Sequence, residues 1–286
     1  MKFIISENQY NLLELYKKGY SLDWDDNILF MPTKIHLEKL VDGNWEPYDV
    51  STEEFREVRS ELGDNLRTTP TSFKDFQEYE AFINDTIQAI NDQRFGPSYD
   101  KFKKSLINID DFSIITARGN PIKALKDGIK VLIKLSFSPL EKNEMKNNLQ
   151  EKGITLDEYL DGQDLQAVSS PEFQQKYGKG EGATKPEEAK TIAFKEYVKR
   201  VVKSAKTLID NPEFKGISIG FSDDDLGNVK KMESFIREIL SKKYPKQFMS
   251  IYKYENKKCN YKHELDKECW DDMRKGQKKY YKKLVD

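Results

Sequence analysis

Strand-like and helix-like patterns of apolar residues alternate along this 286-residue chain. Two β-branched apolar runs, Phe112 to Thr116 and Gly216 to Phe221, have the composition of buried strands. Weaker strand patterns lie at Lys2 to Ile5, Tyr20 to Asp25 and Leu165 to Ser169. The alternation predicts an α/β fold with an open parallel sheet, whose ligands bind at the carboxyl ends of the strands.

Apolar residues at helical spacing separate the predicted strands. One helix begins at Ser51 or Thr52, either of which is a suitable cap. Pro121 suits the first turn of another helix, which follows the strand ending at Thr116. The expected helical ranges are residues 52–62, 73–92, 122–135, 139–160, 186–205 and 228–240.

Residues 34–50 have a two-residue period instead. Apolar Ile35, Leu37 and Val41 occupy alternate positions, the chain turns at Asp42-Gly43-Asn44, and the strand pattern then resumes. A turn of this composition between two alternating runs predicts a β-hairpin.

Composition and charge exclude several classes of protein. The 48 Lys and Arg residues balance 49 Asp and Glu residues, so no overall charge attracts nucleic acid or anionic lipid. The longest apolar runs, such as Ile129 to Leu135, are far shorter than the roughly 20 residues that cross a bilayer. Cys259, Cys269 and His263 provide only three candidate ligands, fewer than a structural zinc site needs. We therefore expect a cytoplasmic protein with no membrane partner.

Acidic or hydroxyl side chains follow three of the predicted strands. They are Asp23 to Asp26, Thr116 and Asp223 to Asp225. Carboxylates that share one cleft repel each other, and they require protonation or a cation between them. Mg²⁺ suits such a site, because oxygen ligands are abundant while the chain has only two His and two Cys residues. A metal beside a free carboxylate is suited to phosphoryl transfer.

These residues also resemble the motifs of the haloacid dehalogenase (HAD) superfamily of phosphotransferases. The segment Leu22-Asp-Trp-Asp-Asp-Asn-Ile-Leu29 is similar to the first motif, an Asp-x-Asp after an apolar strand. Ile114-Ile-Thr-Ala-Arg-Gly119 resembles the second, Lys185-Pro186 the third, and Ile217-Ser-Ile-Gly-Phe-Ser-Asp-Asp-Asp225 the acidic fourth. Their order and strand context agree over roughly residues 20–235. The resemblance implies a Rossmann-like HAD core with an inserted cap.

The resemblance implies a role for each matching side chain. Asp23 would attack phosphorus and form an aspartyl-phosphate, and Asp25 would protonate the leaving oxygen and then activate water. Thr116 would bind a phosphoryl oxygen. Lys185 would stabilise the negative charge, with Lys190 and Lys195 as nearby alternatives.

The implied metal is Mg²⁺, with Asp23, Asp25, Asp223 and Asp224 as its ligands. The choice among Asp223, Asp224 and Asp225 stays open, since Gly-Phe stands at the start of the fourth motif where the family often has Gly-Asp. The first motif departs as well, because Asp-Asn replaces the usual small pair after its second aspartate.

The resemblance also implies a division of the chain. Residues 1–30 and 106–245 would form the core, residues 31–105 the inserted cap, and residues 246–286 a basic extension. The hairpin stretch from Met31 to Val50 further resembles phage-encoded proteins.

The resulting hypothesis is a Mg²⁺-dependent phosphatase that hydrolyses a phosphomonoester. The segment Arg274 to Lys283, with six basic residues and two tyrosines, favours a nucleotide or a nucleic-acid end as the substrate. A phosphotransferase, or a structural or binding protein without turnover, for example in a phage particle, are the alternatives.

Three other residues have ordinary interpretations. Trp24 is expected to pack in the core, with a wall that stacks on a base as the alternative. Arg118 and His36 are expected at the surface, although Arg118 is also a candidate phosphate contact.

Overall fold

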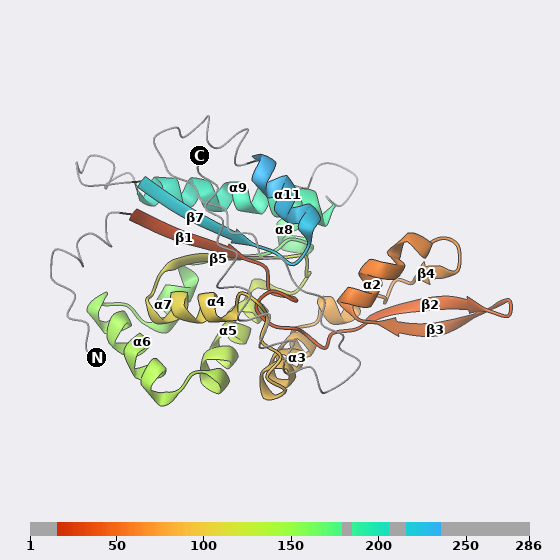
Figure 1. Ribbon diagram of the computed structural model, residues 1–286, viewed down its shortest axis with the longest axis horizontal. Coiled ribbons are helices and arrows are strands. Elements are labelled where there is room, and N and C mark those ends of the chain that lie inside the picture. Colours follow the sequence, from red (N-terminus) through yellow and green to blue (C-terminus); the bar gives the residue numbers. More distant parts are fainter. Residues whose placement is uncertain (1–15, 179–184, 206–215, 236–286) are drawn as a thin grey trace.

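A computed structural model describes residues 16–178, 185–205 and 216–235 of the chain. Within these ranges the chain forms a four-stranded and a three-stranded sheet, shown with their helices in Figure 1. The strand predicted at residues 2–5, the last residues of the helix predicted over 228–240 and the extension at residues 246–286 lie outside the described residues.

The four-stranded sheet is entirely parallel. Its order is β6 (Asp164–Ala167), β5 (Asp111–Thr116), β1 (Tyr16–Leu22) and β7 (Gly216–Ser222). Leu22 at the end of β1 lies opposite Ile114 of β5 and Ser222 of β7. The three strands therefore end at one edge of the sheet. The prediction of an α/β fold with a parallel sheet flanked by helices is confirmed.

Helices cover both faces of this sheet (Figure 1). One face packs against α3 (Tyr79–Asn91), α4 (Tyr99–Ile107), α5 (Ile122–Ser136), α6 (Pro139–Glu151) and α7 (Leu156–Asp161). The other packs against α8 (Pro171–Tyr177), α9 (Pro186–Ser204) and α11 (Leu226–Phe235). Strand β5 shows the two-residue alternation, because Phe112 and Ile114 face the first layer while Ile115 faces the second.

Several helical details differ from the expectation. The helix predicted over residues 139–160 is two helices, because Gly153 takes a φ of 66° and Thr155 caps α7 with a capping box to Glu158. The helix predicted over residues 73–92 is a short 3-10 turn at Lys74–Phe76 followed by α3. Helices α4 and α8 were not predicted. None of the helices among the described residues has the length and apolar character that a bilayer span requires.

The predicted hairpin is confirmed and belongs to the smaller sheet. This sheet contains β2 (Ile35–Val41), β3 (Asn44–Val50) and β4 (Leu66–Thr68), with α2 (Thr52–Val58), η1 (Arg59–Glu61) and η2 (Lys74–Phe76) beside it. Asp42 and Gly43 have φ values of 48° and 84°, which a two-residue hairpin turn of this hand needs. Ser51 caps α2 and forms a capping box with Glu54.

The inserted segment divides its packing between two cores. Ile35, Leu37, Val50 and Leu66 form a small separate cluster. Helix α3 and the greater part of α4, which also belong to residues 31–105, instead pack into the main core. The separately packed unit therefore spans residues 35–76, called the hairpin module below, and it is shorter than the insertion expected from the sequence.

Candidate functional site

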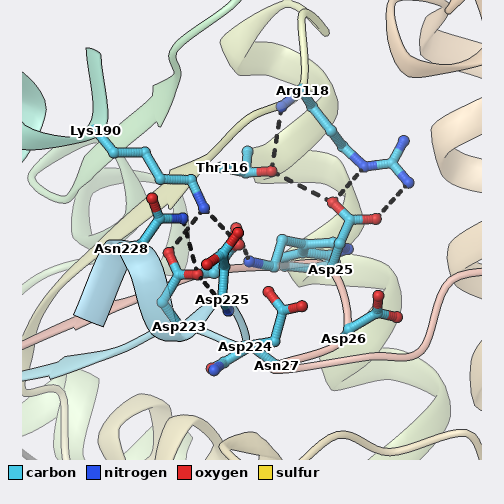
Figure 2. Close-up of polar contacts among 12 residues, drawn as sticks. Asp25, Asp26, Asn27, Thr116, Arg118, Lys190, Asp223, Asp224, Asp225 and Asn228 are labelled. Atoms are coloured by element: carbon cyan, nitrogen blue, oxygen red, sulfur yellow. Dashed lines mark hydrogen bonds and ion pairs between the residues drawn. The ribbon is translucent and has the colours of Figure 1, made fainter. Parts of the chain in front are cut away.

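The predicted chemical residues gather at the carboxyl edge of the parallel sheet. Asp23 directly follows β1, Thr116 ends β5, and Asp223 directly follows β7. The backbone N–H of Asp23 donates to the carbonyl of Ser222 at 3.0 Å, which extends the pairing of β1 with β7 past the last strand residue. The sheet thus brings together side chains that are far apart in the sequence, as Figure 2 shows.

A lysine lies between two of these aspartates. Lys190 Nζ donates to Asp23 Oδ2 at 2.6 Å and to Asp223 Oδ2 at 2.8 Å. All three residues are buried, with exposed fractions of 4% for Lys190, 5% for Asp23 and 1% for Asp223. The cluster therefore holds one cationic and two acidic side chains away from bulk water.

The lysine in this position is not the one that the sequence favoured. Lys185 is the exposed residue that precedes α9, and Lys195 is exposed farther along the helix. Lys190 belongs to the buried face of α9, together with Ala193 and Phe194. The motif context located the correct helix, but the helix period determines which lysine points into the site.

Burial and neighbouring charges shift the pKa values of Asp23 and Lys190. Burial raises the pKa of Asp23 well above its usual value, Lys190 lowers it, and Asp223 and Asp224 raise it again. Burial lowers the pKa of Lys190, but attraction to Asp223 and Asp23 outweighs this effect and raises that pKa overall. The ammonium group is thus held in its charged form by the acids around it.

Three carboxylates offer oxygens close enough to share one cation. Ligand atoms of Asp23, Asp223 and Asp224 all lie within 4.8 Å of one another. Among the described residues, these three form the group of acidic, His or Cys side chains that could hold a metal ion. Asp225 is not in this group, and its Oδ1 accepts from the backbone N–H of Gly227 at 2.6 Å. Asp25, the fourth ligand expected from the sequence, is not in the group.

Negative charge accumulates on the side of the site that faces the hairpin module. Burial and the neighbouring Asp223 raise the pKa of Asp224 to about 6, while an ion pair with Arg56 of α2 lowers it. Burial, Asp224 and Asp25 raise the pKa of Asp26 to about 7, and Thr52 of α2 donates to its Oδ2 at 2.7 Å. The basic residues nearby therefore neutralise the acids only in part.

Asp25 is held by Arg118 at both of its oxygens. Arg118 Nε donates to Oδ2 at 2.8 Å, and Arg118 Nη2 donates to Oδ1 at 2.7 Å. Thr116 Oγ1 also donates to Asp25 Oδ2, at 3.3 Å, and it accepts from the backbone N–H of Arg118. Figure 2 shows these three side chains facing one another beside the acidic group.

The turn after Asp25 is tight even without the small residue pair expected there. Asp26 adopts a φ of 53°, and the buried Asn27 donates to Ser222 Oγ at 2.8 Å. Gly96 lies so close that a Cβ on it would come within 2.4 Å of the Asn27 carbonyl oxygen. Trp24 is fully buried against Phe82 and other aromatic rings, so it is a packing residue.

Three residues near the acids were not singled out correctly from the sequence. Arg118 was expected at the surface, yet it is buried; its position two residues after Thr116 at a strand end was the available signal. Arg56 reaches Asp224 from the hairpin module, and Asn228 of α11 donates to Asp223 Oδ1 at 3.1 Å. No local pattern marks Arg56, because its contact depends on how the module docks.

Comparison with known proteins found no matching family model, no matching curated protein and no matching solved structure.

Proposed function

We propose that this chain is a HAD-like, Mg²⁺-dependent phosphomonoester hydrolase in which the hairpin module acts as the cap. The observation that carries the proposal is the buried Lys190, which bridges Asp23 and Asp223 at the carboxyl edge of the sheet. Two aspartates that follow different strands, joined by a lysine from a helix, resemble the first, fourth and third motifs of that superfamily.

The donor set fits Mg²⁺. Asp23, Asp223 and Asp224 supply oxygens only, and hard divalent cations prefer such ligands. Burial and, after it, the neighbouring Asp223 raise the pKa of Asp224, and a cation in the group would offset the part that comes from like charge. When bound there, Mg²⁺ would supply electrostatic stabilisation of the charge on a phosphoryl group.

Asp23 has the geometry of a prepared nucleophile. Its Oδ1 accepts from the backbone N–H of Trp24 at 2.8 Å, and its Oδ2 accepts from Lys190. These two bonds fix the plane of the carboxylate. A carboxylate oxygen of Asp23 attacks phosphorus, and the bond to the leaving oxygen breaks. In this proposal that oxygen takes its proton from Asp25, which starts the cycle as the protonated acid and becomes the carboxylate.

The second half of the reaction returns Asp23 to its starting form. Water attacks the phosphorus of the aspartyl-phosphate, Asp25 accepts a proton from that water, and the bond from phosphorus to the Asp23 oxygen breaks. In this proposal Thr116 turns its hydroxyl from Asp25 to a phosphoryl oxygen, and Lys190 offsets negative charge on Asp23 and on the transferred group. The products are inorganic phosphate and the free carboxylate.

The hairpin module covers the acidic side of the site. Thr52 and Arg56 lie one helical turn apart on α2 and contact Asp26 and Asp224. A cap that touches the site in this way would select the substrate. A nucleotide or a nucleic-acid end is the substrate class we favour, on the basis of the basic segment Arg274 to Lys283.

The test is phosphate release from a panel of phosphomonoesters, with Mg²⁺ and with a chelator. We expect activity only with Mg²⁺, and a loss of roughly ten-thousandfold in kcat for Asp23→Asn, because the nucleophile is removed. Asp127→Asn is the matched control, since Asp127 pairs with Lys123 on the surface of α5. Full activity in Asp23→Asn would refute the proposal.

A further inference from the structure

A guanidinium group is buried between the core and the segment inserted after β1. Arg118, at the end of β5, has an exposed fraction of 1%. Its guanidinium carbon lies 4.7 Å from the ring centre of Phe76 and 5.1 Å from that of Phe82. The two rings come from η2 and α3, so Arg118 is held by residues of the inserted segment.

Hydrogen bonds then fix the orientation of this guanidinium. Besides its two bonds to Asp25, Arg118 Nη2 donates to Thr33 Oγ1 at 2.6 Å, and Thr33 Oγ1 donates to Asp85 of α3. A bidentate pair whose guanidinium has a third partner leaves the Asp25 carboxylate few orientations. Both Asp25 oxygens accept hydrogen bonds in this arrangement.

Stability alone is a poor explanation for this arrangement. Nη1 of Arg118 is buried with no hydrogen-bond partner among the described residues. An unsatisfied buried donor costs about 1–3 kcal/mol, more for a charged group. A buried ion pair is also often no more stable than apolar residues of similar size. The arrangement therefore suggests a requirement on the position of Asp25.

We infer that Arg118 is a positioning residue that holds Asp25 as the proton acceptor for the water-attack step. This inference rests on the proposed function. Asp25 takes a proton from water while the water oxygen bonds to phosphorus and the bond from phosphorus to Asp23 breaks. Arg118 contacts Asp25 and acts through it. With a leaving group that needs no proton, the loss of Arg118 therefore slows hydrolysis of the aspartyl-phosphate more than its formation.

The experiment separates the two steps with p-nitrophenyl phosphate, whose leaving group departs without help from an acid. Rapid mixing measures the burst of p-nitrophenolate, and a chase measures the decay of phosphorylated Asp23. For Arg118→Lys we expect a burst rate within about threefold of the unmodified protein. We expect the decay of phosphorylated Asp23 to slow by at least about tenfold, part of the usual contribution of a general base.

Two further variants make this result specific. Thr33→Val removes one hydrogen bond to Arg118 but keeps its pair with Asp25, so it should slow the decay in the same direction by a smaller factor. Arg67→Lys is the matched control. Arg67 also stacks on an aromatic ring, that of Trp45, and pairs with a carboxylate, that of Glu38, but it lies in the hairpin module away from the acids.

Each outcome decides the matter. If Arg118→Lys slows the burst and the decay equally, the positioning role is overturned while the proposed function stands. The same holds if Arg118→Lys and Thr33→Val lower only the amount of folded protein and leave both rates unchanged. An unmodified protein that neither releases phosphate nor forms phosphorylated Asp23 refutes the proposed function, and the inference falls with it.

Discussion

The acidic site and the hairpin module contain the same types of ion pair in opposite surroundings. Lys190 pairs with two aspartates in the buried site. In the module, Arg67 pairs with Glu38, and the exposed fractions of the two side chains are 48% for Arg67 and 29% for Glu38. Water screens the pair in the module and leaves it with little net effect, whereas burial makes each charge of the site depend on its partner.

This difference shows where charge has a chemical purpose in the molecule. Buried charges are costly to retain, and here they lie at the ends of three parallel strands, where α/β proteins bind ligands. An exposed ion pair within the module, such as that of Arg67 with Glu38, can change without large effect. Three experiments, from the largest expected effect to the smallest, test this contrast.

The largest effect is expected for Lys190→Met. Without the ammonium group, Asp23 and Asp223 remain buried without their shared cation. We expect the free energy of unfolding to fall by about 3–5 kcal/mol in the absence of metal, measured by urea denaturation. The control is Lys199→Met, which removes an exposed pair with Glu196 and should cost no more than about 1 kcal/mol. Equal losses would contradict the contrast.

Metal should produce the next largest effect. Mg²⁺ bound only by the folded protein adds about 2.7 kcal/mol to the free energy of unfolding at a hundredfold excess over its Kd. Asp223→Asn should reduce this gain, because it removes one of three carboxylates from the group. Glu38→Gln, a change in the module, should leave the gain intact. A gain that persists in Asp223→Asn would place the cation elsewhere.

The smallest effect concerns the pH dependence of the module. His36 Nδ1 lies 2.8 Å from Asp49 Oδ1, and Nε2 lies 2.7 Å from Asp75 Oδ2. Partial burial lowers the pKa of His36, but the hydrogen bonds to Asp75 and Asp49 outweigh it and raise the pKa overall. A raised pKa means that His36 contributes full stability below its unfolded value of about 6.5. That contribution is lost as the pH rises through the folded pKa.

The measurement is urea unfolding of the unmodified protein and of His36→Asn across this pH range. We expect the difference between the two proteins to be no more than about 1 kcal/mol at low pH and to shrink as the pH rises, because the pairs are partly exposed. A difference that grows with pH would show that the sign is wrong.

The sequence predicted those features that depend on local pattern. The β-branched run ending at Thr116 and the apolar run before Asp223 identify buried parallel strands, and the residues after such strands lie at a ligand-binding edge. The hairpin was predictable from its Asp-Gly turn, which suits positive φ values. Asp23, Thr116 and Asp223 could therefore be placed together before any coordinates were known.

Features that depend on tertiary packing were missed. Lys185 precedes α9, whereas Lys190 lies on its buried face, and the loop-to-helix context favoured Lys185 because packing of the helix face was not known. Arginine is rarely fully buried, so Arg118 was expected at the surface until Phe76 and Asp25 were seen to enclose it. Arg56 needed the docking of α2.

Because β1 is a central strand of the sheet, the position of Asp23 in the site depends on the number of residues in β1. Strand β1 pairs with β5 on one side and with β7 on the other, so its alignment is fixed twice. Side chains alternate between the faces of a strand, and a shift of one residue reverses every one of them. Deleting a single residue inside β1 would therefore leave every acidic residue in the sequence. It would still move the side chains of the strand residues on one side of the deletion to the opposite face of the sheet. The number of residues in β1 therefore matters to the site as much as the presence of Asp23 after it.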